Sequence, residues 1–104
     1  MPLYQIKIIT KEYKTDEFVG SLRSLLAGFR KENGCLDYSV YQDFDEEHTF
    51  CISAEWKTHE TMQKHFLTQK FEVLIGAARV LGETFEIITA EVLESGSFEL
   101  VSYR

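Results

Sequence analysis

The run from residue 34 to residue 82 constrains the fold more than any other part of the chain. Residues 35–44 alternate in polarity, an acidic segment follows, and residues 49–57 alternate again. Alternation with a period of two predicts β-strands, and a short polar segment between two such strands predicts a hairpin. The run therefore begins with two antiparallel strands, and any fold for this chain must contain them as neighbours.

The segments before and after this hairpin complete the pattern. Apolar residues at helical spacing predict helices, and alternating runs near the two ends, rich in β-branched residues, predict further strands. The expected helices are 16–32, 59–66 and 68–81, and the expected outer strands are 4–10 and 84–93. The order β-α-β-β-α-β predicts an α+β, ferredoxin-like domain, in which one antiparallel sheet carries its helices on one face.

We expect residues 1–104 to form a single domain, because a chain of this length supports one ordinary core. The sheet face away from the helices is expected to carry small and apolar side chains, among them Cys35, Cys51 and Ile88. Apolar surface of this kind usually marks an interface. The sequence therefore predicts a homodimer packed sheet to sheet, with the tail at 94–104 pairing with an edge strand of the partner.

The charge of the chain excludes several kinds of partner. Its net charge is -6 at pH 7, whereas nucleic acids and anionic membrane surfaces attract basic proteins, so we expect neither as a partner. No apolar run approaches the roughly 20 residues that span a bilayer. The first residues have a strand pattern rather than the pattern of a signal peptide, which favours a cytoplasmic protein.

Cys35 and Cys51 are the only cysteines, and they fall on neighbouring predicted strands. A disulfide between them is one possibility, but nothing in the sequence directs the chain to an oxidising compartment. We therefore expect two reduced, partly buried thiols. Two cysteines and scattered histidines do not supply the four clustered ligands of a zinc site, so no metal is expected.

Side chains with aromatic rings and polar tips gather on the strand face that is expected to meet the helices. Leu36 and Tyr38 share this face on one strand, Trp56 lies on the next, and Tyr4 can join them from the first strand. Such rings can hold a flat aromatic molecule by stacking and hydrogen bonding, or they can simply fill the core. The apolar walls of a pocket are expected from Phe66, Phe71 and Phe85.

His65, on the short helix after Trp56, has two interpretations. As a general base it needs a ring nitrogen within about 3 Å of a substrate. In the other interpretation it bonds a backbone carbonyl and holds the loop in place. Trp56 likewise either donates its indole N–H to a developing oxyanion or serves as a large core side chain.

The chain resembles the antibiotic biosynthesis monooxygenase (ABM) family of dimeric α/β-barrel proteins. The residues that carry the resemblance are Gly34-Cys35, the acidic turn at 43–47, Ala54-Glu55-Trp56, His65 and Phe71. With the flanking strands, the resemblance covers nearly the whole chain. Members of this family include cofactor-independent oxygenases of polyketide quinols, quinol monooxygenases, heme-degrading enzymes and a sugar-phosphate isomerase.

The heme-degrading members are a poor match. They use an Asn on the first strand, a Trp on the third and a His late in the second helix. Trp56 corresponds to the second of these residues, but residues 4–9 contain no Asn and residues 72–76 contain no His. A protein ligand to heme iron is therefore missing, and we expect no cofactor.

Together with the aromatic strand face, the resemblance implies a cofactor-independent monooxygenase acting on a quinol-like or polyketide aromatic. Oxygen would react directly with a deprotonated, electron-rich substrate, in a site that supplies a base and excludes water. The expected catalytic residues are Trp56, His65 and Tyr38, and the expected substrate-binding residues are Tyr4, Phe66, Phe71 and Phe85.

Two alternatives remain open from the sequence. A sugar-phosphate isomerase would need cations for the phosphate, and Lys57, Lys64 and Arg79 are the candidates near the predicted pocket. A non-catalytic module that sequesters a small apolar ligand would need a pocket into which no titratable group reaches. The direction in which His65 points distinguishes this module from the two enzymes.

Overall fold

The computed structural model describes residues 1–93 and residue 96. The strands are β1 (Pro2–Thr10), β2 (Cys35–Gln42), β3 (Thr49–Trp56) and β4 (Gly82–Glu91). The helices are α1 (Thr15–Arg30), α2 (His59–Phe66) and α3 (Gln69–Leu81), with a short 3-10 turn, η1 (Glu12–Lys14), before α1. The predicted order of elements is confirmed. The tail at 94–104, which was expected to pair with a partner, lies outside the described residues apart from residue 96.

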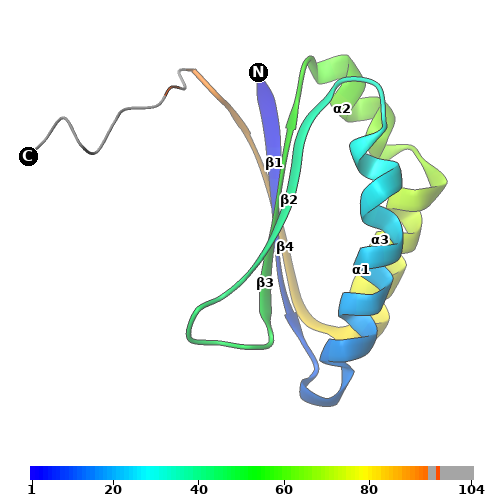
Figure 1. Ribbon diagram of the computed structural model, residues 1–104, viewed down its shortest axis with the longest axis vertical. Coiled ribbons are helices and arrows are strands. Elements are labelled where there is room, and N and C mark those ends of the chain that lie inside the picture. Colours follow the sequence, from blue (N-terminus) through cyan, green and yellow to red (C-terminus); the bar gives the residue numbers. More distant parts are fainter. Residues whose placement is uncertain (94–95, 97–104) are drawn as a thin grey trace, which may run out of the picture.

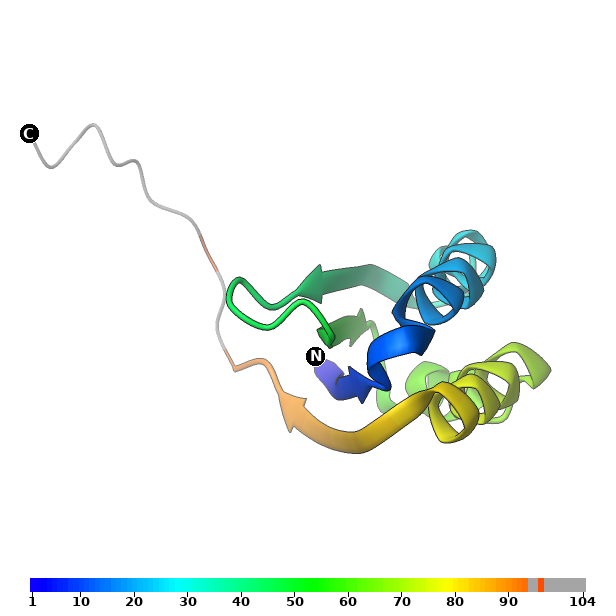
Figure 2. The same cartoon turned by 90° about the horizontal axis from the view of Figure 1, so that it is seen from below.

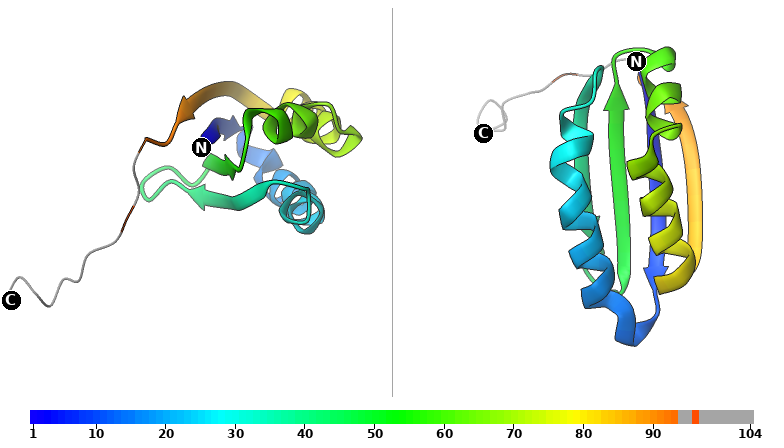
Figure 3. Two further views of the ribbon diagram at one scale, coloured as in Figure 1. Left: turned by 90° about the horizontal axis from the view of Figure 1, so that it is seen from above. Right: turned by 90° about the vertical axis from the view of Figure 1, so that its right-hand side faces the viewer.

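The strands form one antiparallel sheet in the order β2-β3-β1-β4. All three helices lie on the same side of this sheet (Figure 1), and α1 and α3 run side by side across it (Figure 2). Viewed from the helical side, α1 covers the β2 half of the sheet, while α2 and α3 cover the β1 and β4 half (Figure 3). The predicted α+β, ferredoxin-like class is confirmed, and no helix or strand in the described part of the chain covers the other face of the sheet.

The core lies between the sheet and the helices, as the alternation predicts. Tyr4, Ile6 and Ile8 of β1 are buried in the alternating pattern of a strand with one covered face. Helix α1 supplies its buried side at helical spacing, with Phe18, Leu22, Leu25 and Phe29.

Strand β2 differs from its prediction at one point. Cys35 pairs with Trp56 and Asp37 pairs with Glu55, so Leu36 is an extra residue in a bulge. Cys35 therefore packs against the core on the helical side, while Leu36 is 49% exposed. The prediction that Cys35 lies on the far face, and Leu36 on the covered face, is wrong, because an inserted residue shifts the alternation.

Both cysteines are free and partly buried, as predicted. Cys35 lies opposite Trp56, whereas Cys51 lies opposite Tyr41, six residues further along β2. At the rise of a β-strand this separation is about 20 Å, well beyond the roughly 7 Å limit between the Cα atoms of a disulfide. None of the helices in the described part of the chain has the length and hydropathy needed to cross a bilayer.

Candidate functional site

Four side chains from three separate stretches of the sequence form one buried chain of hydrogen bonds. The Tyr4 hydroxyl lies 2.7 Å from the Tyr38 hydroxyl and 2.7 Å from Nε2 of His65. Nδ1 of His65 lies 2.9 Å from Oε1 of Glu32. The order Glu32–His65–Tyr4–Tyr38 joins the segment after α1, helix α2 and strands β1 and β2. We call this set of four residues the polar chain.

The sheet register explains why the two tyrosines meet. Ala54 on β3 pairs with Tyr4 on one side and with Tyr38 on the other. Because alanine is small, the two rings can converge above it, and their hydroxyls come within hydrogen-bond distance. Both tyrosines are buried, with 0% and 2% of their surface exposed.

Helix α2 positions the histidine. Its first turn is held by a capping box, in which the Thr58 side chain accepts from the backbone N–H of Thr61. Gly34 has φ of 85° and lies against the Thr61 side chain, which places the start of α2 beside the start of β2. Met62 and His65, three residues apart, then share the buried side of the helix.

Aromatic rings surround His65. The Trp56 ring lies over it, with centroids 4.5 Å apart, and the Tyr4 ring stacks at 5.5 Å. The rings of Phe29 and Phe71 approach it edge-on, each at 5.0 Å. This enclosure removes water from both sides of the imidazole and leaves its two nitrogens to side-chain partners.

The enclosure also determines the protonation of the polar chain. Burial lowers the pKa of His65, and the hydrogen bond and charge of Glu32 oppose this shift only in part. A neutral His65 donates its Nδ1–H to Glu32 and accepts at Nε2 from Tyr4, which then accepts from Tyr38. Burial raises the pKa of Tyr4 and of Tyr38, so both hydroxyls keep their protons.

Protonation of His65 reverses the direction of these bonds. The imidazolium donates from Nε2 to the Tyr4 oxygen, and Tyr4, which has one proton, then donates to Tyr38. The polar chain thus has two complete hydrogen-bonding patterns that differ by one proton. A proton can enter at one end and be held at His65 without breaking a contact.

Two buried polar atoms at this site lack a hydrogen-bond partner within the described residues. They are the indole nitrogen of Trp56 and Oε2 of Glu32. An unmet buried group of this kind costs about 1–3 kcal/mol, so native proteins seldom keep one without a reason. The Trp56 N–H lies beside the polar chain and can donate to an oxygen atom of a bound molecule.

Trp56 and His65 are closed off from solvent, with 0% and 1% of their surface exposed. A surface depression of about 350 Å³ is lined by Phe66, Phe71, Glu72, Ile75, Gly76 and Arg79. Phe66 and Phe71 also contact the Tyr4 ring, at 5.1 and 6.0 Å between centroids. These two rings are therefore the layer between the depression and the polar chain.

The structure brings most of the predicted site residues together. Trp56, His65, Tyr38, Tyr4, Phe66 and Phe71 form one cluster. Phe85 is apart from it: this residue pairs with Ile8, four residues along β1 from Tyr4, and is 40% exposed. Both ring nitrogens of His65 bond side chains and not the backbone carbonyl of the second interpretation.

Sequence reasoning did not identify Glu32. It follows the end of α1, where a carboxylate is unfavourable beside the negative end of the helix dipole. That unfavourable position is the one local signal that could have singled it out. Its partner, His65, is 33 residues away in the sequence.

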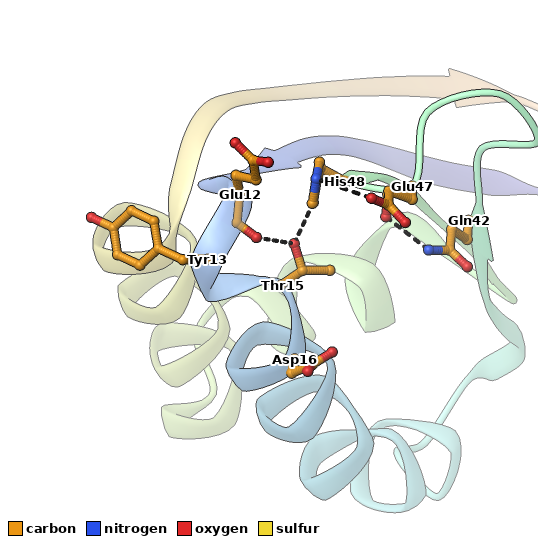
Figure 4. Close-up of a pocket in the computed structure, with 7 residues that line it drawn as sticks. All are labelled: Glu12, Tyr13, Thr15, Asp16, Gln42, Glu47 and His48. Atoms are coloured by element: carbon orange, nitrogen blue, oxygen red, sulfur yellow. Dashed lines mark hydrogen bonds and ion pairs between the residues drawn. The ribbon is translucent and has the colours of Figure 1, made fainter.

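A second, more polar hollow lies where β1 ends and β3 begins, away from Trp56, and Figure 4 shows the residues that line it. It is lined by Glu12, Tyr13, Thr15, Asp16, Gln42, Glu47 and His48. Nδ1 of His48 bonds the Thr15 hydroxyl at 2.6 Å, which fastens the β2–β3 hairpin to the start of α1. Within the described residues, no three histidine, cysteine or carboxylate side chains are grouped so as to hold a metal ion.

Comparison with known proteins identifies the family to which the chain is similar. The model of the family "Antibiotic biosynthesis monooxygenase" matches residues 3–76. The Bacillus subtilis protein named "Putative monooxygenase YcnE" is 27% identical over 95 residues, which are 90% of this chain and 100% of that protein.

Solved structures show the same fold. That of a putative antibiotic biosynthesis monooxygenase from Deinococcus radiodurans has a TM-score of 0.88 and 21% identity, over 95% of this chain and 99% of that one. PA3566 from Pseudomonas aeruginosa has a TM-score of 0.79 and 26% identity, over 89% and 95% of the two chains. Since the family model spans most of the chain, from β1 into α3, the protein belongs to the antibiotic biosynthesis monooxygenase family.

Proposed function

We propose that this protein is a cofactor-independent monooxygenase of an electron-rich hydroxylated aromatic, of the quinol-like or polyketide type. The observation that carries the proposal is the buried indole N–H of Trp56, which has no acceptor in the described residues and lies beside the polar chain. A preorganised donor next to an acid–base group is what the reaction of oxygen with a carbanion requires.

In this proposal the substrate enters from the depression when Phe66 and Phe71 turn aside. The Tyr4 oxygen then receives a proton from the substrate as Tyr4 passes its own proton to Nε2 of His65. The carboxylate of Glu32 stabilises the imidazolium that forms and keeps its Nδ1–H in place. Tyr38 completes the hydrogen bonding of Tyr4 in both states.

The oxygen step balances without a further reductant. The substrate loses one proton to the polar chain, either from a CH₂ group between hydroxylated rings or from a phenolic hydroxyl, and becomes a carbanion at a carbon that bears hydrogen. This carbanion transfers one electron to O₂, and the two radicals combine to a peroxide anion, which Trp56 can stabilise by donating its N–H. Return of the proton gives a hydroperoxide, and loss of water leaves a carbonyl.

Oxygen uptake with a panel of hydroquinones and hydroxyanthrones tests the proposal. We expect uptake by the protein, and a loss of roughly 100-fold or more in His65→Gln, as is usual when a general base is removed. Trp56→Phe should also reduce the rate. His48→Gln is the matched control, because His48 lies at the other end of the molecule. Uptake no greater than that of the Trp56→Phe/His65→Gln double variant would refute the proposal.

A non-catalytic ligand-binding module is the second candidate, and the closed packing over His65 favours it. The isomerase has less support, since Arg79 is the only one of its three proposed cations that lines the depression. Ligand binding without any turnover of the panel would favour the module.

The proposal includes a homodimer formed through the outer sheet face, a small aromatic molecule as partner and a cytoplasmic location. The exposed apolar residues of that face, such as Ile88 at 53%, support the dimer. The two free thiols fit a reducing compartment.

A further inference from the structure

We infer that the depression beside Phe66 and Phe71 binds a hydroxyaryl carboxylate, with its carboxylate at Arg79 and its hydroxylated ring over the two phenylalanines. This inference rests on the proposed function, since it names the substrate class of that same site. It specifies which end of the molecule meets the polar chain.

The size of the depression fits a molecule of one or two fused rings. Its volume is about 350 Å³, near the lower end of the roughly 300–1,000 Å³ of small-molecule sites. Glu72, Ile75, Gly76 and Arg79 are spaced three to four residues apart on α3, so they form one side of the helix. Phe66 and Phe71 both line the depression, and the partly exposed Phe66 ring offers an apolar surface against which an aromatic ring can pack.

The charged residues at the two ends of the depression determine which end of the ligand carries its carboxylate and which end its hydroxyl group. Arg79 makes no ion pair or side-chain hydrogen bond with any residue that the structure describes, and the same is true of Glu72. Seven residues of helix separate them by about 10.5 Å along the axis. A guanidinium matches a carboxylate in geometry, whereas a carboxylate accepts from a phenolic hydroxyl.

The orientation follows from the neighbours of each end. Glu72 is next to Phe71, whose ring lies 5.0 Å from that of His65. Arg79 is two helical turns further on, away from the polar chain. The hydroxylated ring therefore lies at the end of the depression nearer the acid–base groups, with Phe66 and Phe71 between them, and the carboxylate remains at the distant end. A net charge of -6 repels anions in general, so binding of an acid must come from a local cation.

Gly76 lines the depression and leaves free space where a side chain would begin. A Cβ atom built at this position meets no atom within 4 Å. A Cβ atom can therefore be added at this position without a clash, and a longer side chain would extend from the lining of the depression, while the helix would gain from losing a glycine. Gly20 on α1 has the same open surroundings and provides a matched control position.

Calorimetric titration with compounds that oxygen does not attack tests this inference apart from catalysis. We expect 2-naphthoate to bind about tenfold more tightly than 2-naphthamide, as for one charge-assisted contact. Arg79→Gln should abolish this difference, whereas Arg23→Gln, which changes an exposed arginine on α1, should keep it. Gly76→Leu should abolish binding, and Gly20→Leu should not.

Equal affinity for the acid and the amide would overturn the inference, as would unaltered binding by Arg79→Gln or by Gly76→Leu. Its failure is distinguishable from failure of the proposed function. Selective binding of 2-naphthoate, without oxygen uptake on the quinol and anthrone panel or on any hydroxyaryl carboxylate, would support the ligand class and refute the oxygenase. Oxygen uptake on neutral quinols that is insensitive to Arg79→Gln, with equal affinity for 2-naphthoate and 2-naphthamide, would support the oxygenase and refute the ligand class.

Discussion

Ala54 shows how one small side chain can create a polar site inside a hydrophobic core. It separates Tyr4 from Tyr38 across the sheet, and their hydroxyls meet at 2.7 Å above it. A larger residue at this position would fill the space that the two rings share. The methyl group of alanine thus matters here for the volume that it leaves free.

His65 should make the stability of the fold depend on pH. Burial holds its folded-state pKa below the ordinary value of 6.5. Below pH 6.5 the unfolded chain therefore binds a proton that the folded chain does not, and the free energy of unfolding decreases as the pH falls toward the folded-state pKa. Above that window the histidine contributes no pH dependence.

Urea unfolding at about pH 7.5 and about pH 5.5 measures this effect. The His65→Gln variant should lose less of its unfolding free energy than the parent when the pH is lowered. His59→Gln is the control, since His59 is exposed at the start of α2. Equal pH dependence in the parent and His65→Gln would contradict the prediction.

At the scale of elements, the contact between the start of β2 and the start of α2 holds the histidine helix. Gly34 accepts at its carbonyl from the backbone N–H of Lys57 at 2.7 Å, just before α2. The left-handed φ of Gly34 and its contact with Thr61 leave no room for a side chain.

Gly34→Ala should therefore destabilise the protein by about 2 kcal/mol or more, from backbone strain and the clash with Thr61 together. Gly20→Ala, in a helical position with open space, should instead stabilise it by about 0.5–1 kcal/mol. Urea unfolding of both variants measures the difference. A neutral Gly34→Ala would show that the contact with α2 is readily released.

Secondary structure was the most predictable level. The periodicities predicted the helices and strands with small differences at their ends: 59–66 agrees with α2, and 16–32 became Thr15–Arg30. The bulge at Leu36 was not predictable, since one extra residue in an alternating run leaves no local mark.

At the scale of the whole molecule, the described elements leave apolar side chains exposed on the outer face of the sheet. Ile88 and Tyr41 are 53% and 59% exposed, on strands at the two edges of the sheet. Covering such a face by a second copy would bury apolar surface that a single chain leaves in water.

We expect analytical ultracentrifugation to show two chains per particle at micromolar concentration. Ile88→Asp should yield single chains, because a carboxylate would have to be buried unpaired in the interface. Val80→Asp, at an exposed position on α3, is the control and should leave the dimer intact. A parent protein that sediments as a single chain would refute the dimer.

The sequence by itself determined the elements, their order, the covered sheet face and the aromatic residues on it. These follow from local spacing, which the backbone geometry of helices and strands imposes. Only the tertiary structure decided that Glu32, His65, Tyr4 and Tyr38 form a single chain, and that Phe85 lies outside it. Spacing along one element says which way a side chain faces, but the meeting of side chains from different elements depends on sheet register, a small residue such as Ala54 and the packing of α2.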